Sequence, residues 1–503
     1  MVYDFSYKVS SFKTQIFKCL MFCFCLISIT CFSQEILSFD KQMELRKLTF
    51  SEDSLFTPEQ LQEDFRYYCK IILETHPNPY YVISKEIFDA KVENILKSLD
   101  KPMNRRKFWL KIATLNACFD GHTNIEKISE VYDPNSKLIL PFNLLMLDSL
   151  ENLYFNPKYR DSLLAGKYIK SINDISAKQI IDTISAYYSH ENKNMLPIEF
   201  LYTSSLIYRN LFDNIDSIRI EYVIDNEINV HTFYPWKPST NTASSTQTKQ
   251  ETEKKKVVRF HIYEEESIAI IEIDNFITEL LGENYRKDLE KMMSAIVEKN
   301  IKHLFINISL NGGGDSDNAL EILNFIKTDK KKYNVDTSEI RISPVSCKHK
   351  KLDCKDFASF IKKHKKQLYE TPDGKIMMKE DYYWTKNNSK IQYSQNVYLI
   401  QSEYSFSATV DLSSVVKAYK IATIIGSETG GLTSCYIDAP TLVMPNTLIP
   451  FRCSVQKCIN VGGKWDGRGV FPDVEYKIVN SSKSFTLEQL KEMLELVGEY
   501  KKQ

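Results

Sequence analysis

The chain lacks a net charge although charged residues are abundant. Among its 503 residues, Lys and Arg together number 65, and so do Asp and Glu. Proteins that bind nucleic acid need a basic excess or a basic patch, so this balance gives no electrostatic argument for a nucleic-acid partner. With 43% apolar and 12% aromatic residues, the chain can bury substantial cores. Its length predicts two to four domains.

Long hydrophobic runs are also scarce. Only the segment from Cys19 to Phe32 resembles one, and it has the length of a signal-peptide core rather than of a membrane span. We therefore predict a signal peptide over 1–33, cleavage after Ser33, and an exported protein that is periplasmic or secreted. The alternatives are a retained membrane anchor or a lipoprotein attached through Cys31.

Cysteine pairs with CxxC spacing are absent from the seven cysteines that follow the predicted signal peptide. The close pairs Cys347/Cys354 and Cys453/Cys458 are candidates for disulfide bonds in an exported protein. Their spacings do not favour a metal site. We expect no metal and no cofactor.

The N-terminal region, 34–136, has the apolar spacing of helices. Thr57 followed by Pro58 predicts a capped helix start. Two further helices are expected over Lys85–Leu99 and Asn104–Ala117. The region ends in a short polar segment that contains His122.

The middle region, 137–237, reads as mixed α/β. Ala165–Asn173 predicts a turn and an alternating strand, and a helix is expected near Ala177–Tyr188. The segment 238–256 is rich in Ser, Thr, Gln and Lys, which is typical of a flexible linker or loop.

The C-terminal part, 257–480, alternates strands with helices, which predicts an α/β domain with a largely parallel sheet. The expected elements are Ile268–Ile273, Asn284–Glu298, Leu304–Ile308 and Asp317–Lys327. The Lys-rich segment at about 329–396 is interpreted as an insertion with one or two helices and a solvated charged face. A capped C-terminal helix is expected within 481–503.

Ser407 stands at a place where a strand turns into a helix. The apolar strand Val397–Ile400 precedes it, and an amphipathic helix follows it. A helix start leaves N–H groups that can stabilise negative charge, so this serine is a candidate nucleophile. The alternative is that Ser405 and Ser407 are ordinary helix caps.

Three consecutive glycines, Gly312, Gly313 and Gly314, follow the strand 304–308 and Asn311. Such a run costs chain entropy, and it suits a loop whose backbone approaches a ligand. A phosphate loop is disfavoured because no Gly-Lys-Ser/Thr follows and aspartates come next. An oxyanion pocket fits better, and a tight strand–helix turn is the alternative.

A nucleophilic serine needs a base. Among eight histidines, His122 is the best candidate, because Gly121 would let it project from a loop. A single histidine in a loop is weak evidence when taken alone.

These elements together resemble the C-terminal-processing and tricorn-like serine peptidases, also called tail-specific proteases. The resemblance rests on the Asn-Gly-Gly-Gly loop, the Ser407-Ala408 turn, Gly426–Gly431, and Asp120-Gly121-His122-Thr123. Met444-Pro445-Asn446 and Gly469–Asp473 match the closing elements of the family. The resemblance implies a crotonase/ClpP-like catalytic domain and a PDZ-like middle region.

The resemblance also implies roles for individual residues. Ser407 becomes the nucleophile, Ala408 one oxyanion donor, and one of the glycines 312–314 the second donor. The processing-protease branch uses a lysine where this chain has Leu432, so the tricorn-like branch, whose base is a histidine matched by His122, fits better. Asp466 and Glu428 are candidates to orient that base. The implied substrate is a peptide or a protein chain end.

Some positions depart from the family pattern. Asn307 and Leu310 stand where an acidic residue and an arginine are usual, and Val410 stands where an acidic residue often follows the nucleophile. One rival interpretation is therefore an inactive relative that binds peptides or other ligands. A second rival is a crotonase-like acyl-transfer or isomerase enzyme, which shares the oxyanion geometry but does not explain the N-terminal regions.

Overall fold

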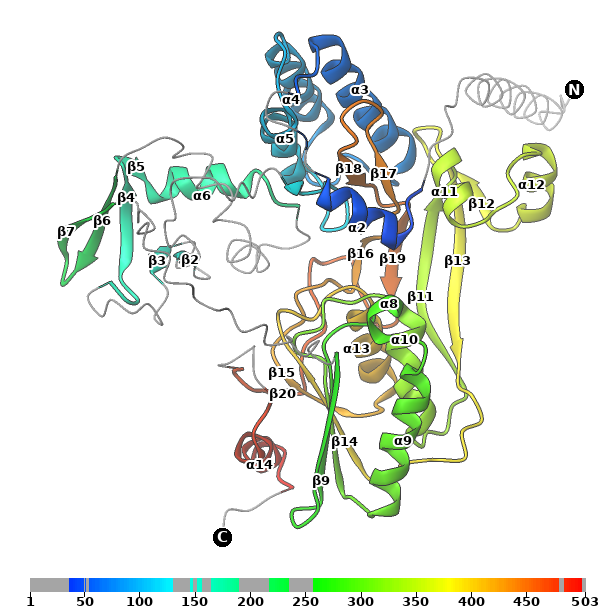
Figure 1. Cartoon of the computed structure of the whole chain (residues 1–503). Helices are drawn as coiled ribbons and strands as arrows, with labels where there is room; N and C mark the ends of the chain where they lie inside the picture. The colour runs from blue at the N-terminus through cyan, green and yellow to red at the C-terminus, as the bar shows by residue number, and fades with distance from the viewer. Residues whose placement is uncertain are drawn as a thin grey trace, which may run out of the picture.

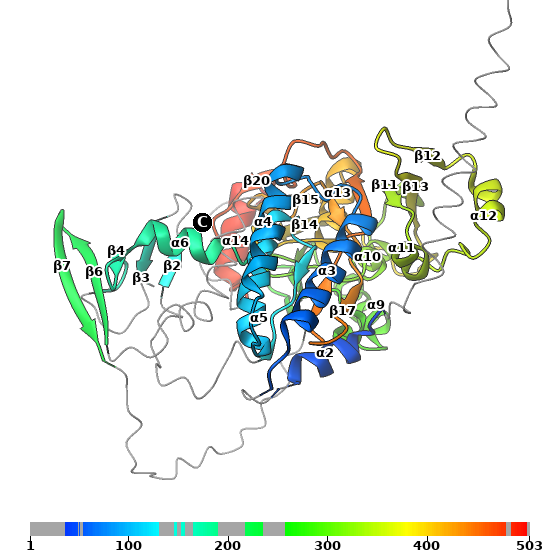
Figure 2. The same ribbon diagram turned by 90° about the horizontal axis from the view of Figure 1, so that it is seen from above.

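The computed structural model describes residues 36–48, 50, 54–129, 145–147, 152–155, 164–189, 217–234, 257–478 and 484–499. The predicted signal peptide and the predicted linker lie outside these residues. Within the described part of the chain, no helix is long and apolar enough to cross a membrane. Figures 1 and 2 show a helical N-terminal region, a small sheet to one side, and a large α/β region.

The N-terminal region is helical, as predicted. Thr57 caps α3 through a capping box with Gln60, and Pro58 occupies the first turn, so the predicted helix start is confirmed. The predicted third helix is shorter than expected, because its last turn winds as the 3-10 helix η1. The elements are α2 (Phe39–Lys47), α3 (Pro58–Thr75), α4 (Lys85–Ser98), α5 (Arg105–Ile112) and η1 (Ala113–Cys118).

A hairpin from near the C-terminus joins this helical region. Strand β1 (Asn124–Ile125) pairs with β18 (Pro450–Arg452), which pairs with β17 (Thr441–Val443). The buried carboxylate of Asp64 on α3 accepts hydrogen bonds from Asn446 and Thr447 in the hairpin turn at 2.6–2.9 Å. Apolar hairpin residues also belong to the core cluster of the N-terminal helices. Residues far apart in sequence therefore form one structural unit.

The middle region forms a small sheet that stands apart from the α/β region in both views (Figures 1 and 2). Its strand order is β2-β3-β4-β6-β7, with antiparallel pairings, and α6 follows the short strand β5. The mixed α/β prediction is confirmed, and the PDZ-like assignment stays a prediction. The elements are β2 (Leu145–Leu147), β3 (Leu153–Phe155), β4 (Tyr168–Ile172), β5 (Ile175–Ser176), α6 (Ala177–Ser185), β6 (Ile218–Ile224) and β7 (Glu227–Phe233).

The central sheet of the α/β region has the order β20-β15-β14-β10-β9-β8, and every pairing except β8 with β9 is parallel. The predicted largely parallel sheet is confirmed. One face packs against α9 and α13, and the other packs against α14. The elements are β8 (Val258–Tyr263), β9 (Ile268–Ile273), α8 (Thr278–Leu281), α9 (Tyr285–Glu298), β10 (His303–Asn307), α10 (Ser316–Leu320), η5 (Glu321–Phe325), β14 (Asn396–Gln401), α13 (Ala408–Tyr419), β15 (Thr423–Gly426), β20 (Val474–Glu475) and α14 (Leu487–Leu496).

A second sheet has the order β12-β13-β11-β19-β16. Three of its strands, β11, β12 and β13, come from the segment at about 329–396 that was predicted to be an insertion with one or two helices. One or two helices were expected there and two are present, but the two ten-residue strands β11 and β13 were not predicted. Strand β11 is central in this sheet because it pairs with both β13 and β19. The elements are β11 (Lys332–Arg341), α11 (Pro344–His349), α12 (Phe357–His364), β12 (Leu368–Glu370), β13 (Ile376–Thr385), β16 (Ser434–Ile437) and β19 (Gln456–Asn460).

The cysteines follow one of the two predicted pairings. Cys347 and Cys354 form a disulfide bond that closes a short loop after α11. The predicted Cys453–Cys458 bond is wrong, because both thiols are free and buried. Proximity in sequence misled the prediction here, since Cys458 lies on β19 and faces Cys435 on the neighbouring strand.

Candidate active site

The turn between β14 and α13 holds Ser407 in an unusual backbone conformation. Its φ is 56° and its ψ is −126°, and although it stands at the N-cap of α13, its side chain makes no capping hydrogen bond. A non-glycine residue in a sparsely populated conformation costs about 1–3 kcal/mol and persists only where the surroundings impose it. The structure therefore does not support the helix-cap interpretation of Ser407.

Asn311 ties the glycine loop to this turn. Its Oδ1 accepts the Gly313 N–H at 2.8 Å, and its main-chain carbonyl accepts the Phe406 N–H at 3.2 Å. The hydroxyl of Thr409 lies within 3.0 Å of both Asn311 oxygens. A Cβ on Gly313, where φ is 106°, would lie 2.7 Å from the Cβ of Ser407. Only glycine lets the two loops approach this closely.

The glycines Gly312, Gly313 and Gly314 lie in different environments. The Gly313 N–H is engaged by Asn311, and Gly314 lines the pocket that contains Ser407. A Cβ on Gly314 would meet the backbone of Phe276 at 2.2 Å, whereas nothing lies within 4 Å of one on Gly312. Ser405 has a structural role, because its hydroxyl donates to the carbonyl of Ile308 at 3.0 Å.

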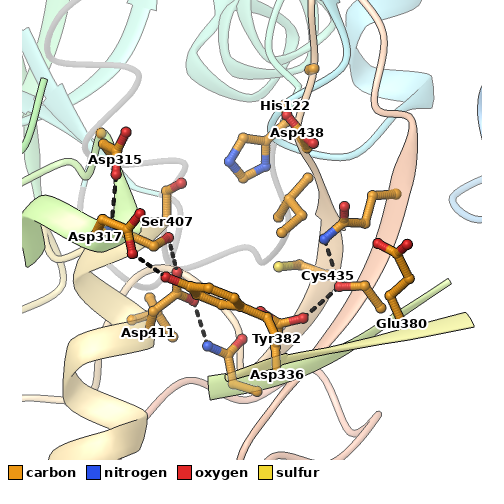
Figure 3. A pocket seen from close by; sticks show the side chains of 18 of the residues that line it. His122, Asp315, Asp317, Asp336, Glu380, Tyr382, Ser407, Asp411, Cys435 and Asp438 are labelled. Atoms are coloured by element: carbon orange, nitrogen blue, oxygen red, sulfur yellow. Dashed lines mark hydrogen bonds between the residues drawn. The ribbon is translucent and has the colours of Figure 1, made fainter. Parts of the chain in front are cut away.

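The fold brings His122 to the same pocket as Ser407. The imidazole is 7% exposed and stacks on Phe406, the residue before Ser407, with ring centroids 5.0 Å apart. Figure 3 shows His122 and Ser407 on facing walls of this pocket. These side chains come from the N-terminal helical region and from the central sheet, so the pocket forms where the two regions meet.

A buried network holds the loop that carries His122. Asp120 accepts the His122 main-chain N–H at 2.9 Å, the Ser454 hydroxyl at 2.9 Å, and lies 2.8 Å from Nε2 of His76. Burial alone would raise the pKa of Asp120, but the hydrogen bond to His76 and the nearby imidazoles hold it at about 2. Asp120 is therefore a carboxylate at neutral pH.

The pocket has a cavity volume of about 590 Å³, and its wall includes Leu432 at the position where a lysine base was considered. Lys457, the nearest lysine after it in sequence, pairs with Glu339 at 3.2 Å and does not line the pocket. Lys350 does line it, and its ammonium group pairs with Asp438.

The two candidates for orienting His122 lie elsewhere. Glu428 forms a bidentate pair with Arg468 at 2.7 and 2.9 Å and also accepts the Gly469 N–H. Asp466 accepts the Arg468 main-chain N–H at 3.1 Å. Neither is among the described residues that line the pocket of His122 and Ser407.

Three residues in or next to the pocket were not among the predicted site residues. Phe406 was passed over as part of the strand–helix turn, and Asp411 as a residue of the amphipathic helix. Asp336 lay in the supposed insertion. Asp411 and Asp336 line the pocket, and Phe406 stacks on the His122 ring. No local sequence signal marks Asp336, because its place depends on the pairing of β11 with β19.

The sequence also matches a known protein family. Residues 267–476 match the model of peptidase family S41. The α/β region of the chain is therefore similar to the peptidases of family S41. This similarity supports a serine peptidase, and the matched residues contain Ser407 and the glycine loop but not His122.

Two solved structures resemble this chain over most of its length. The crystal structure of mature CPAF has 10% sequence identity and a TM-score of 0.54, covering 83% of this chain and 92% of that chain. The structure of mature CPAF complexed with lactacystin has 11% identity and a TM-score of 0.53, covering 83% and 94%. At these identities the likeness supports the fold alone. Among curated proteins, none matches the sequence.

Proposed function

We propose that this protein is an exported enzyme that cleaves peptide bonds with a Ser407–His122 pair. Ser407 attacks the carbonyl carbon of the substrate while His122 takes the hydroxyl proton and then returns it to the leaving amine. The observation that carries the proposal is the shared pocket of these two side chains, with the His122 ring stacked on Phe406.

Two backbone N–H groups are assigned to the oxyanion. Ala408 is the first residue of α13, where helix N–H groups have no partner within the helix. Among the three glycines we assign the second donor to Gly314, because it lines the pocket whereas the Gly313 N–H is engaged by Asn311. Removing one such donor typically costs about 2.7–4 kcal/mol of transition-state stabilisation.

The positioning of His122 is assigned to Asp120. Its carboxylate accepts the main-chain N–H of His122 and is itself held by His76 and Ser454. Glu428 and Asp466 are given no catalytic step in this proposal, because Arg468 contacts both.

The substrate is proposed to bind as an extended strand. β16 stands at an edge of the five-stranded sheet, and its residues Cys435 and Ile437 line the pocket beside Ser407. A peptide can add to such an edge through main-chain hydrogen bonds and place alternate side chains in pockets. This mode suits a peptide or the end of a protein chain.

A fluorophosphonate probe, which labels activated serines, tests the proposal on the purified protein. We expect labelling of the wild type, none of Ser407→Ala, and much weaker labelling of His122→Ala. Ser413→Ala is the matched control, since this hydroxyl lies buried on the same helix and makes no hydrogen bond in the described structure.

Two outcomes would contradict the proposal. Labelling that survives Ser407→Ala would show that another residue is the nucleophile. A folded wild type that neither labels nor cleaves peptides would favour the alternative of an inactive, peptide-binding family member.

A further inference from the structure

The wall of the pocket beneath Ser407 is acidic. Asp411 follows Ser407 by one turn of α13, and its main-chain N–H approaches the Ser407 carbonyl at 3.4 Å. Its carboxylate is 8% exposed and accepts hydrogen bonds from Ser316 and Asn460 at 2.5 Å each. A buried carboxyl group is thus held about one helical turn from the proposed nucleophile.

A second buried carboxylate faces the first. Asp336 on β11 is 5% exposed, lines the same pocket, and stands opposite Asn460 in the β11–β19 register. Its Oδ1 accepts the Ser338 hydroxyl at 2.5 Å. Figure 3 shows Asp336 and Asp411 in the same part of the pocket, below Ser407.

The cationic side chains of Lys350 and Arg452 also line this pocket, and the Lys350 charge lowers the pKa of Asp336. Lys350 pairs with Asp438, and the Nε of Arg452 donates to the carbonyl of Ala439 at 3.2 Å. Four further carboxylates line the pocket: Asp315, Asp317, Glu380 and Asp381. Burial raises the pKa of Asp336 to about 6, and the Asp411 charge adds to this effect. Burial likewise raises the pKa of Asp411.

The side-chain oxygen of Gln456 is a second, independent indication that a ligand with hydrogen-bond donors binds here. This residue of β19 is 7% exposed and lines the pocket. Its Nε2 donates to the Ser338 hydroxyl at 2.6 Å, while its buried Oε1 has no partner in the described structure. A buried polar atom without a partner costs free energy, so an acceptor left open beside two buried carboxylates suits a ligand that donates several N–H bonds.

We propose that this part of the pocket binds a lysine or arginine side chain of the substrate next to the scissile bond. Asp336 and Asp411 supply the charge, and Gln456 Oε1 accepts one N–H. A metal ion is less suited, because the described residues contain no group of three His, Cys, Asp or Glu side chains placed to hold one. This inference rests on the proposed peptidase function and adds the substrate class.

Cleavage of matched peptides is the first test. Peptides with lysine or its uncharged isostere norleucine at one position are incubated with the enzyme, and mass spectrometry locates the cut. We expect the lysine peptide to be favoured in kcat/KM by about tenfold or more, equivalent to about 1.4 kcal/mol. Asp336→Asn and Asp411→Asn should each reduce this preference, with melting curves confirming a folded protein.

Asp225→Asn is the control for removing one negative charge. Asp225 lies exposed in the β6–β7 turn, where its φ of 50° is one that asparagine tolerates. We expect this variant to retain the full preference for lysine. Equal cleavage of the lysine and norleucine peptides by the wild type would overturn the inference and leave the peptidase proposal intact.

Binding to the Ser407→Ala variant separates the two proposals further. Fluorescence anisotropy with the same peptides, labelled, needs no catalysis. Tighter binding of the lysine peptide, weakened by Asp336→Asn, would support the inference even if the wild type cleaves nothing. Equal binding of both peptides, or lysine preference that survives both Asp→Asn changes, would overturn it.

Discussion

The turn that holds Ser407 and the loop that holds His122 face one pocket but are stabilised in different ways. The Ser407 turn is built by adjacent parallel strands, β10 and β14, whose carboxyl ends place the glycine loop beside the serine. The His122 loop is held by residues from distant segments, namely His76 and Ser454. The position of the proposed nucleophile thus depends on one sheet, and that of the proposed base depends on the docking of two regions.

This difference predicts which substitutions affect activity alone and which affect both activity and stability. A change in the Ser407 turn should alter the chemistry and leave the protein folded. A change in the joint around Asp64 or Asp120 should lower both stability and activity, because the same contacts hold the regions together and place His122.

The largest expected effect is on the serine itself. Ser407→Ala should lower kcat/KM for a cleaved peptide by roughly 10⁴-fold or more, because it removes the group proposed to form the covalent intermediate. Thermal melting should stay close to that of the wild type. A variant that keeps more than a tenth of the activity would place the nucleophile elsewhere.

Gly313→Ala should cause the second-largest loss of activity. The added Cβ would meet Phe406 O at 2.6 Å and the Ser407 Cβ at 2.7 Å, at a φ of 106°. Displacing the serine by about 1 Å should cost about 10²-fold in kcat. Gly312→Ala is the matched control, since nothing lies within 4 Å of its Cβ position. Equal activity of the two variants would mean that the close approach of the loops is unimportant.

Asp64→Ala tests the joint. The substitution removes the carboxylate that accepts hydrogen bonds from Asn446 and Thr447. Each buried donor left without an acceptor costs about 1–3 kcal/mol of stability. We expect a loss of about 3 kcal/mol or more in urea unfolding, together with reduced activity. Asp40→Ala, in the exposed first turn of α2, is the control. Full activity in a destabilised Asp64→Ala protein would show that His122 does not need this joint.

Stability at low pH provides a test of Asp120. Its pKa falls from 3.8 to about 2 on folding, so its contribution is present above pH 4 and is lost as the pH falls through 2. The shift corresponds to roughly 2 kcal/mol. Asp120→Asn should flatten the pH dependence of urea unfolding between pH 4 and 2, and an unchanged slope would contradict the assignment.

The contribution of Asp336 to stability should depend on pH in the opposite direction to that of Asp120. Its pKa is raised from 3.8 to about 6 on folding, so it favours the folded state below pH 4 and loses this contribution as the pH rises through 6. Asp336→Asn should therefore gain stability relative to the wild type above pH 6, by roughly 3 kcal/mol. A constant difference between the two proteins from pH 4 to 8 would contradict this.

Local signals predicted much of the fold. Thr57 and Pro58 start α3 as expected, and Ile268–Ile273 is a strand with the predicted bounds. The prediction was weakest where pairing between distant segments decides the structure. Strands β11 and β13 lie in a Lys-rich segment whose apolar faces are recognisable only once their partners are known. The Cys453–Cys458 pairing failed for the same reason.

The sequence by itself determined the strand–Ser407–helix turn, the glycine loop and the helical segment that carries His122, because these depend on local backbone preferences and on glycine. The tertiary structure decided that His122 and Ser407 line one pocket, that Gly314 rather than Gly313 lines it, and that Asp336 and Asp411 line it together. It also placed Glu428 and Asp466 with Arg468. Contacts between distant segments depend on packing and strand pairing, which no local pattern of residues specifies.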